Sequence, residues 1–225
     1  TPPGAAGRTP GTRLGPAGGD TCRAVGSGYS VRDQRRQREF VELRLGGRAQ
    51  IVRDDFGVMN SDTATACSGC GVRLPAVNAP VHPYMTSSPA CWLRYGDLLA
   101  AQYSNPKRMA FHQVVVDAYA VQHPDGDDPR AVQSVAIHLM TLCLFLETGI
   151  DPSQGPRLHR RMIDRPVFHH LEAPPSRGRL TMLDVPLDDN PEKARRAAYA
   201  WAKEVWTAWE THHQTVRNWI EESGL

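Results

Sequence analysis

The sequence predicts an all-α protein built around a four-helix bundle. Two observations carry this prediction. Four stretches of the 225-residue chain open with a capping side chain followed directly by proline, at Ser88-Pro89, Asn105-Pro106, Asp128-Pro129 and Asn190-Pro191. Proline suits the first helical position, because the N–H there has no helical partner and the fixed φ is already helical. Apolar residues then recur at the spacing of three and four residues that places them on one face of a helix.

Composition and charge exclude several classes of protein. Hydrophobic residues make up 40% of the chain, and the formal net charge is only +2. This balance argues against a dedicated nucleic-acid binder, which concentrates excess Lys and Arg on one face. No run reaches the roughly 18 apolar residues of a membrane span, and no signal peptide is recognisable. We therefore expect a cytoplasmic protein with no nucleic-acid and no membrane partner.

Residues 1–58 differ from the rest of the chain. The first 20 residues are mostly Gly, Pro, Ala and Arg, so they have too little to bury to offset the entropy lost on ordering. The arginine-rich segment 31–45 has too few apolar positions for a core of its own. Its arginines are compatible with RNA binding, but an unstructured tail is the simpler interpretation. Because Met59 stands directly before the first dense motif, we expect residues 1–58 to be a disordered or non-native extension.

A Cys-rich segment, residues 59–88, is expected to bind zinc. The chain has five cysteines, an odd number, and Cys67 and Cys70 form a Cys-x-x-Cys-Gly motif. Its glycines permit a turn in which two thiolates face one ion at about 2.3 Å. The nearest candidates for the two remaining ligands are His82 and Cys91. The alternatives are a redox dithiol and, for Cys91, a small buried hydrophobic residue.

The bundle is predicted to occupy residues 89–225. Its helices are expected at 89–103, 105–122, 128–147 and 190–222, and Gly149 is expected to end the third helix in a left-handed conformation. The sequence His123-Pro-Asp-Gly ends the second helix. Prolines exclude long helices from residues 151–189, so we expect a crossover there that contains one short helix, 155–163.

Histidines on three of the predicted helices lie among apolar residues. They are His112, His138 and His213, with His212 as an alternative to His213. Metal sites in bundles are built from side chains that project inward from facing helices, so these histidines are compatible with a three-nitrogen site open to water or substrate. Carboxylates that would orient such imidazoles are Asp117, Glu147 and Glu210. The competing interpretation is that the histidines are hydrogen-bonded core residues.

The order of motifs over residues 60–222 resembles an uncharacterised bacterial family, a domain of unknown function. The motifs are Cys67-Ser-Gly-Cys-Gly, His82-Pro-Tyr, Pro89-Ala-Cys-Trp, Val116-Asp-Ala-Tyr-Ala-Val-Gln-His-Pro, Gln133-Ser-Val-Ala-Ile-His-Leu and the segment from Trp201 to Trp219. This resemblance implies no activity. More loosely, the helix number and histidine placement are similar to the DinB-like metal-binding fold, whose members include metal-dependent transferases and hydrolases. The chain departs from that pattern in its Cys-rich segment and its adjacent histidines.

Two functions from different classes follow from these patterns. The first is a metal-dependent hydrolase or transferase that acts on a small molecule, with a structural zinc and a second divalent metal at the bundle histidines. The second is a non-enzymatic, zinc-stabilised interaction module with structural histidines. The sequence contains no Gly-rich phosphate loop and no Gly-x-Ser-x-Gly motif, which argues against nucleotide hydrolysis and serine-hydrolase chemistry.

Overall fold

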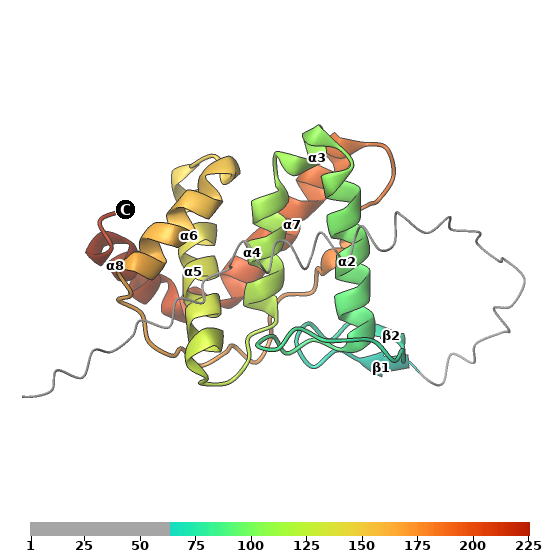
Figure 1. The fold of residues 1–225 in the computed structure, drawn as a ribbon, viewed down its shortest axis with the longest axis horizontal. Helices are drawn as coiled ribbons and strands as arrows, with labels where there is room; N and C mark the ends of the chain where they lie inside the picture. Colours follow the sequence, from blue (N-terminus) through green and yellow to red (C-terminus); the bar gives the residue numbers. More distant parts are fainter. Residues whose placement is uncertain (1–63) are drawn as a thin grey trace, which may run out of the picture.

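The computed structural model describes residues 64–225, and this part of the chain is mostly helical, as the sequence predicts (Figure 1). The elements are β1 (Ala64–Ala66), β2 (Arg73–Pro75), α2 (Pro89–Tyr103), α3 (Pro106–Met109), α4 (His112–Gln122), α5 (Pro129–Cys143), α6 (Gly155–Asp164), α7 (Pro191–Ala208) and α8 (His213–Glu222). The predictions for residues 1–58 lie outside the described residues.

The two short strands form an antiparallel hairpin whose loop carries the Cys-x-x-Cys pair. Thr65 lies opposite Leu74 in the register. Within the loop, the backbone N–H of Cys67 donates to Val72 O at 2.8 Å, and Gly71 N donates to Cys67 O at 2.8 Å. Gly71 has a φ of 76°, a conformation that a residue without a Cβ adopts readily. This tight turn presents both cysteines on the same side of the hairpin loop.

Helix α2 has the predicted bounds, whereas the predicted second helix is divided. The side chain of Ser88 caps α2 by accepting a hydrogen bond from Cys91 N. At Phe111 the backbone leaves the helical conformation, with φ −118° and ψ 14°, which separates α3 from α4. The Phe111 side chain is buried there. The guanidinium of Arg108 donates to the carbonyl oxygens of Pro186 and Asp188, so α3 is held against the crossover instead of continuing into α4.

Helix α5 is long and largely apolar. It continues into a π-helical turn, Leu144–Thr148, and Gly149 ends it with a φ of 72°, the left-handed end that the sequence predicts. The segment Pro129–Thr148 is long and apolar enough to cross a membrane, but most of it is buried inside the protein. Burial of this kind is typical of a core helix, because contacts with neighbouring helices remove the apolar surface from water.

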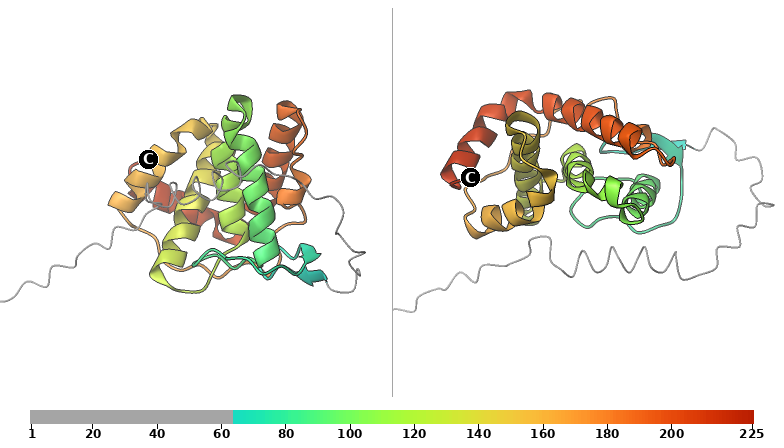
Figure 2. Two further views of the ribbon diagram at one scale, coloured as in Figure 1. Left: turned by 45° about the vertical axis from the view of Figure 1, so that its right-hand side comes forward. Right: turned by 90° about the horizontal axis from the view of Figure 1, so that it is seen from above.

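The predicted long C-terminal helix is divided at Trp209. Trp209 has φ −93° and ψ 17°, and a 3-10 turn, Glu210–His212, leads into α8. Its indole is fully buried, so the bend directs a large apolar side chain into the core. The change of direction lets α7 pack against α4 and α8 pack against α5. Seen from above, α7 and α8 curve along one side of the other helices (Figure 2).

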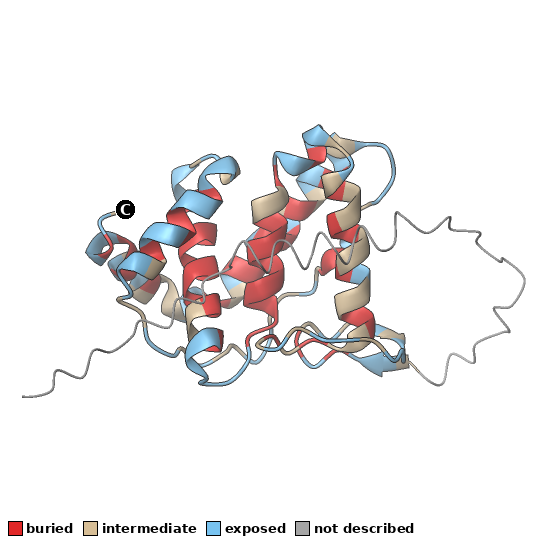
Figure 3. Cartoon of the chain, in the orientation of Figure 1, coloured by how far each residue is buried: buried red, intermediate tan, exposed pale blue. Residues whose placement is uncertain are grey.

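Helix α4 lies at the centre of the core and is buried along most of its length (Figure 3). It packs against α5 and α7, and its Tyr119 ring stacks on Tyr95 of α2 at 3.7 Å between centroids. The indole N–H of Trp201 donates to Gln122 at 3.0 Å, and the amide of Gln122 donates in turn to Leu180 O at 2.8 Å. The end of α4 is therefore fixed by α7 and by the crossover together.

Candidate metal centres

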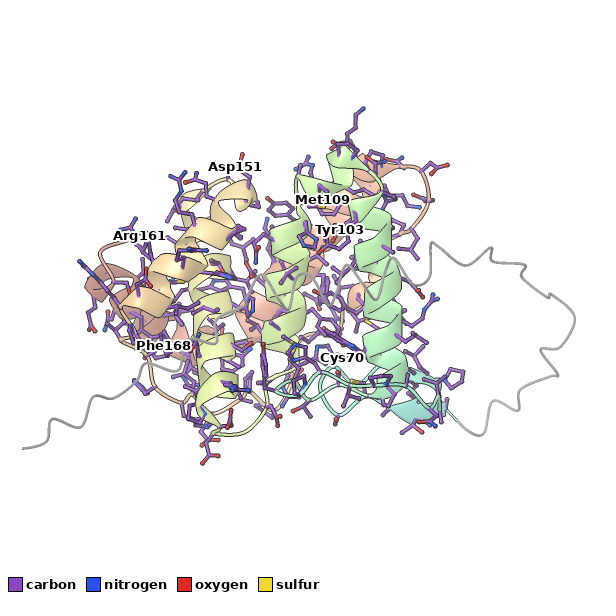
Figure 4. All side chains as sticks on the ribbon, in the orientation of Figure 1. Cys70, Tyr103, Met109, Asp151, Arg161 and Phe168 are labelled. Carbon is purple, nitrogen blue, oxygen red and sulfur yellow. The ribbon has the colours of Figure 1, made fainter. Side chains whose placement is uncertain are left out.

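Three cysteines and a histidine come together below α2 and form the first candidate site, which we call the thiolate centre. Cys67, Cys70, Cys91 and His123 each offer one ligand atom within 4.8 Å of the other three. The first two come from the hairpin loop, Cys91 from the first turn of α2, and His123 from the residue after α4. The label on Cys70 in Figure 4 marks the position at the lower end of α2, beside the two strands.

The distances in the thiolate centre fit one tetrahedral ion. The Sγ atoms of Cys70 and Cys91 are 3.8 Å apart, and Cys91 Sγ lies 3.3 Å from His123 Nε2. Ligands about 2.3 Å (sulfur) and about 2.1 Å (nitrogen) from a tetrahedral zinc are separated by about 3.8 Å (S to S) and about 3.6 Å (S to N). None of these cysteines forms a disulfide, so all three sulfur atoms are available as ligands.

The histidine of the thiolate centre is held in the tautomer that a metal requires. His123 Nδ1 lies 2.7 Å from the backbone carbonyl oxygen of Tyr119. A carbonyl oxygen can only accept, so Nδ1 carries the proton and Nε2 presents a lone pair to the sulfur atoms. A hydrogen bond on the other ring nitrogen is the usual way in which proteins orient a ligating histidine. The Tyr119 ring also stacks on the imidazole at 4.0 Å, which fixes its plane.

Hydrogen bonds among the three sulfurs of the thiolate centre shift their pKa values in opposite directions. The pKa of Cys67 is lowered because its sulfur accepts hydrogen bonds from Cys70 and Cys91. The same interactions raise the pKa of Cys70 to about 11 and raise that of Cys91, where burial adds to the effect. The three sulfurs therefore share hydrogen bonds in which Cys70 and Cys91 act as the donors. A divalent ion can replace the protons on these two sulfurs, because ligation deprotonates a thiol.

Hydrogen bonds from Ser88, at the start of α2, and from Arg177 support the thiolate centre. The amide of Ser88 donates to Cys67 Sγ at 3.4 Å. Arg177, in the crossover, donates to the carbonyl oxygens of Ser68 and Gly69 at 3.1 and 2.6 Å. These contacts hold the hairpin loop against the helices, although few apolar residues lie within the loop.

Of the four ligands predicted for zinc, the structure brings together Cys67, Cys70 and Cys91 but not His82. The His82 ring packs edge-on against Tyr84 and Trp92, at 4.2 and 5.1 Å between centroids. His123 occupies the fourth position instead. The sequence carried one signal for it, since antiparallel neighbours place the end of the second helix beside the start of the first.

A second candidate site lies between three helices, and we call it the carboxylate centre. Asp117 of α4, His138 of α5 and His159 of α6 each offer a ligand atom within 4.8 Å of the others, and all three are buried. His138 Nδ1 lies 2.6 Å from Asp117 Oδ1, and His159 Nε2 lies 3.5 Å from the same oxygen. Burial alone would raise the pKa of Asp117, but its hydrogen bonds to the two histidines lower it to about 2.

The three bundle histidines predicted to share a metal are not brought together. His112 Nδ1 faces Gln102 Oε1 at 2.8 Å, and the ring lies against Tyr103. His213 stacks on Trp206 at 3.8 Å and donates to its carbonyl oxygen. The alternative residue, His212, donates to Glu172 O. Of the three, only His138 belongs to a candidate metal group.

Of the three carboxylates that were expected to orient the bundle histidines, only Asp117 hydrogen-bonds to one of those histidines in the part of the chain that the structure describes. Asp117 contacts His138 directly. Glu147 instead accepts from the Arg217 guanidinium at 2.9 Å and from the Trp206 indole at 3.1 Å. Glu210 lies in the 3-10 turn and is exposed. Neither glutamate belongs to a candidate metal group in the described residues.

The half-buried imidazole of His112 gives a testable pH dependence. Burial lowers its pKa to about 4. The unfolded chain takes up this proton near pH 6.5 and the folded chain only near pH 4, so stability is present above the unfolded pKa and is lost as pH falls. Between pH 7 and pH 5 the free energy of unfolding of the wild type should fall by about 1–2 kcal/mol more than that of His112→Asn, because asparagine does not titrate. Urea unfolding of both proteins at each pH measures this difference, and parallel losses would contradict it.

The fold and the two centres define a class: a mostly helical protein with cysteine, histidine and aspartate groups that can hold metal ions. The chain belongs to a family of unknown function, DUF5946, whose model matches residues 65–210 and so includes both centres. The resemblance to an uncharacterised domain of unknown function is thereby confirmed. No curated protein and no solved structure matches the chain, so the four-helix bundle and the DinB-like analogy stay predictions.

Proposed function

We propose that the protein is a zinc-stabilised helical protein in which Cys67, Cys70, Cys91 and His123 hold one structural Zn²⁺. The observation that carries this proposal is the convergence of these four ligand atoms within 4.8 Å. Four protein ligands of the Cys₃His type close a tetrahedron and leave no position for substrate, which is the arrangement of structural zinc sites. Thiolates and imidazole together favour zinc over magnesium or calcium, which prefer oxygen ligands.

The proposed zinc joins parts of the chain that are distant in sequence. It links the hairpin loop to the start of α2 and the end of α4. The hairpin has only three residues in each strand, too few to be stable in water without further support. Binding energy at a structural zinc is also folding energy, because the unfolded chain has no preformed site. The ion therefore replaces the hydrophobic core that this segment lacks.

The proposed zinc also positions residues that line a cleft. A cleft of about 460 Å³ is lined by residues 124–127, which directly follow the ligand His123, and by residues 169–173 and Arg177. Because Arg177 also bonds to the hairpin loop, two walls of this cleft depend on the thiolate centre. This arrangement favours a non-enzymatic interaction module in which zinc fixes the shape of the cleft.

The hydrolase or transferase interpretation has less support from the geometry. It requires an open metal position that a substrate can reach. The predicted ligands His112, His138 and His213 lie in separate surroundings. The carboxylate centre that contains His138 is buried, with no exposure at all for the side chains of Asp117 and His138. We therefore favour the non-enzymatic alternative.

A matched pair of histidine variants tests the zinc assignment. Zinc that a thiol-specific mercurial releases from native protein is measured with a coloured chelator. We expect one zinc per chain for the wild type and for His82→Asn, and less than about a tenth of that for His123→Asn. Loss of a residue that only contacts a ligand weakens metal binding about 10–100-fold, and loss of the ligand itself should weaken it more. Retention of zinc by His123→Asn with its loss from His82→Asn, or no mercurial-released zinc in the wild type, would contradict the proposal.

A further inference from the structure

We propose that the carboxylate centre, Asp117, His138 and His159, binds a second metal ion, a divalent transition metal, independently of the thiolate centre. The two centres have no ligand in common. They also differ in chemistry, because one offers thiolates and the other offers only imidazole nitrogen and carboxylate oxygen. The second site is therefore a separate proposal from the structural zinc, and each can be tested without the other.

The geometry of the carboxylate centre is that of a metal site formed inside a group of helices. Each ligand comes from a different helix, α4, α5 or α6, and projects into the space between them. Donors about 2.1 Å from one ion are separated by about 3.0 to 3.4 Å. The His159 Nε2 to Asp117 Oδ1 distance of 3.5 Å is close to this range. The 2.6 Å contact of His138 Nδ1 with the same oxygen is a hydrogen bond, so an ion bound at Nδ1 would replace its proton, and the two atoms would move apart by about 0.4–0.8 Å. Small side-chain rotations suffice for that change.

The buried charge of Asp117 provides a second, independent observation. Its side chain has no exposure, and its Oδ2 atom has no hydrogen-bond partner among the described residues. The ion pairs of Asp117 within residues 64–225 are with the two histidines only, and no Lys or Arg compensates the carboxylate. An ionised carboxylate in a protein interior is costly unless a cation or several donors compensate it. Gln113 and His138 donate to Oδ1, so Oδ2 is the oxygen that is left for a cation.

Polar side chains of α4 and α5 also contact the proposed ligands. Thr141 Oγ1 lies 3.1 Å from His159 Nε2, and an ion bound at Nε2 would replace this contact. The amide of Gln113 donates to Asp117 Oδ1 at 2.8 Å. A hydrogen bond of this kind orients a carboxylate ligand in a metal site. The His159 side chain is 8% exposed whereas the other two have no exposure, so an ion would reach the site past His159.

The ligand set indicates the class of ion. Two imidazoles and one carboxylate suit Zn²⁺, Mn²⁺, Fe²⁺, Co²⁺ or Ni²⁺, whereas Ca²⁺ and Mg²⁺ prefer oxygen ligands alone. With three protein ligands the ion keeps positions that water can fill. Residues of the thiolate centre are not needed, so the second ion should resist reagents that attack sulfur.

Metal counting on the full chain tests this proposal. The protein is incubated with excess Zn²⁺, Mn²⁺, Fe²⁺, Co²⁺ or Ni²⁺ in turn, desalted and analysed for bound metal. We expect the wild type to hold one ion that a thiol-specific mercurial does not release, with at least one of these metals. His159→Gln and Asp117→Asn should lose that ion and keep the mercurial-released zinc. The control His170→Gln changes a histidine outside both centres and should behave as the wild type.

A spectroscopic measurement on the wild type covers the case in which the variants fail to fold. With Co²⁺ in both centres, mercurial treatment should abolish thiolate-to-cobalt charge-transfer absorption and leave the weaker ligand-field bands of the carboxylate centre. Absence of any mercurial-resistant ion or band in the wild type would overturn the second site and leave the proposed zinc untouched. Mercurial-resistant metal that persists in folded His159→Gln and Asp117→Asn would overturn it as well.

Discussion

Cys91→Ser is expected to lower the melting temperature by about 8–16 °C, the shift that a loss of about 4 kcal/mol produces in a domain of this size. The Sγ atom of Cys91 contacts three side chains: it lies 3.8 Å from Cys70 Sγ, 3.3 Å from His123 Nε2 and 3.5 Å from the Tyr119 hydroxyl. Serine has nearly the same shape but binds zinc poorly, so the substitution removes the metal without opening a large cavity. The lost stability is therefore mainly the binding energy of the ion.

Cys143→Ser is the matched control for Cys91→Ser. Cys143 of α5 is also a buried free cysteine, but it belongs to neither centre. Its substitution should cost about 1 kcal/mol and leave mercurial-released zinc unchanged. Calorimetry with and without a strong chelator measures both effects, and the chelator should bring the wild type close to Cys91→Ser. Equal melting temperatures for the two variants, with zinc retained in both, would show that Cys91 is only a packed hydrophobic residue.

Local sequence signals predicted the helix starts because the interactions that form them are local. Each of the four predicted capping residues, Ser88, Asn105, Asp128 and Asn190, accepts a hydrogen bond from the first turn of its helix. The breaks at Phe111 and Trp209 were not predicted. Both are large apolar residues that fit a helical stripe, and only packing against other elements shows that the backbone bends to bury them.

The candidate sites were harder to predict because they depend on how helices pack. Cys67, Cys70 and Cys91 lie close in sequence, whereas His123 joins them only because the end of α4 lies beside the start of α2. Helical periodicity predicts which face of a helix a side chain lies on, but not the level along the helix axis at which it meets a neighbouring helix. His112 therefore lies at the start of α4, while Asp117, more than one turn further along, meets His138. The bend at Trp209 places His213 on Trp206 instead of in the centre.

Gly69→Ala is expected to destabilise the protein by roughly 3 kcal/mol, the upper end of what overpacking costs, and to weaken zinc binding. A Cβ at Gly69 would lie 2.2 Å from His123 Cδ2 and 2.4 Å from Thr86 O. Neither neighbour can move freely. The His123 ring is stacked on Tyr119, and the backbone of Thr86 donates to His123 O at 3.1 Å. The added methyl group must therefore displace either the hairpin loop, with two cysteines, or the histidine ligand.

Gly126→Ala provides the control for this substitution, because a Cβ at Gly126 meets no heavy atom within 4 Å. Its effect should stay within about 0.5 kcal/mol. Urea unfolding gives the two stabilities, and competition with a chelator of known affinity gives zinc binding. If the close packing of Gly69 against the ligand His123 is what orders the thiolate centre, Gly69→Ala must lose both stability and zinc affinity relative to Gly126→Ala. Equal zinc affinity in the two variants would show that the loop and the imidazole adjust independently of the metal.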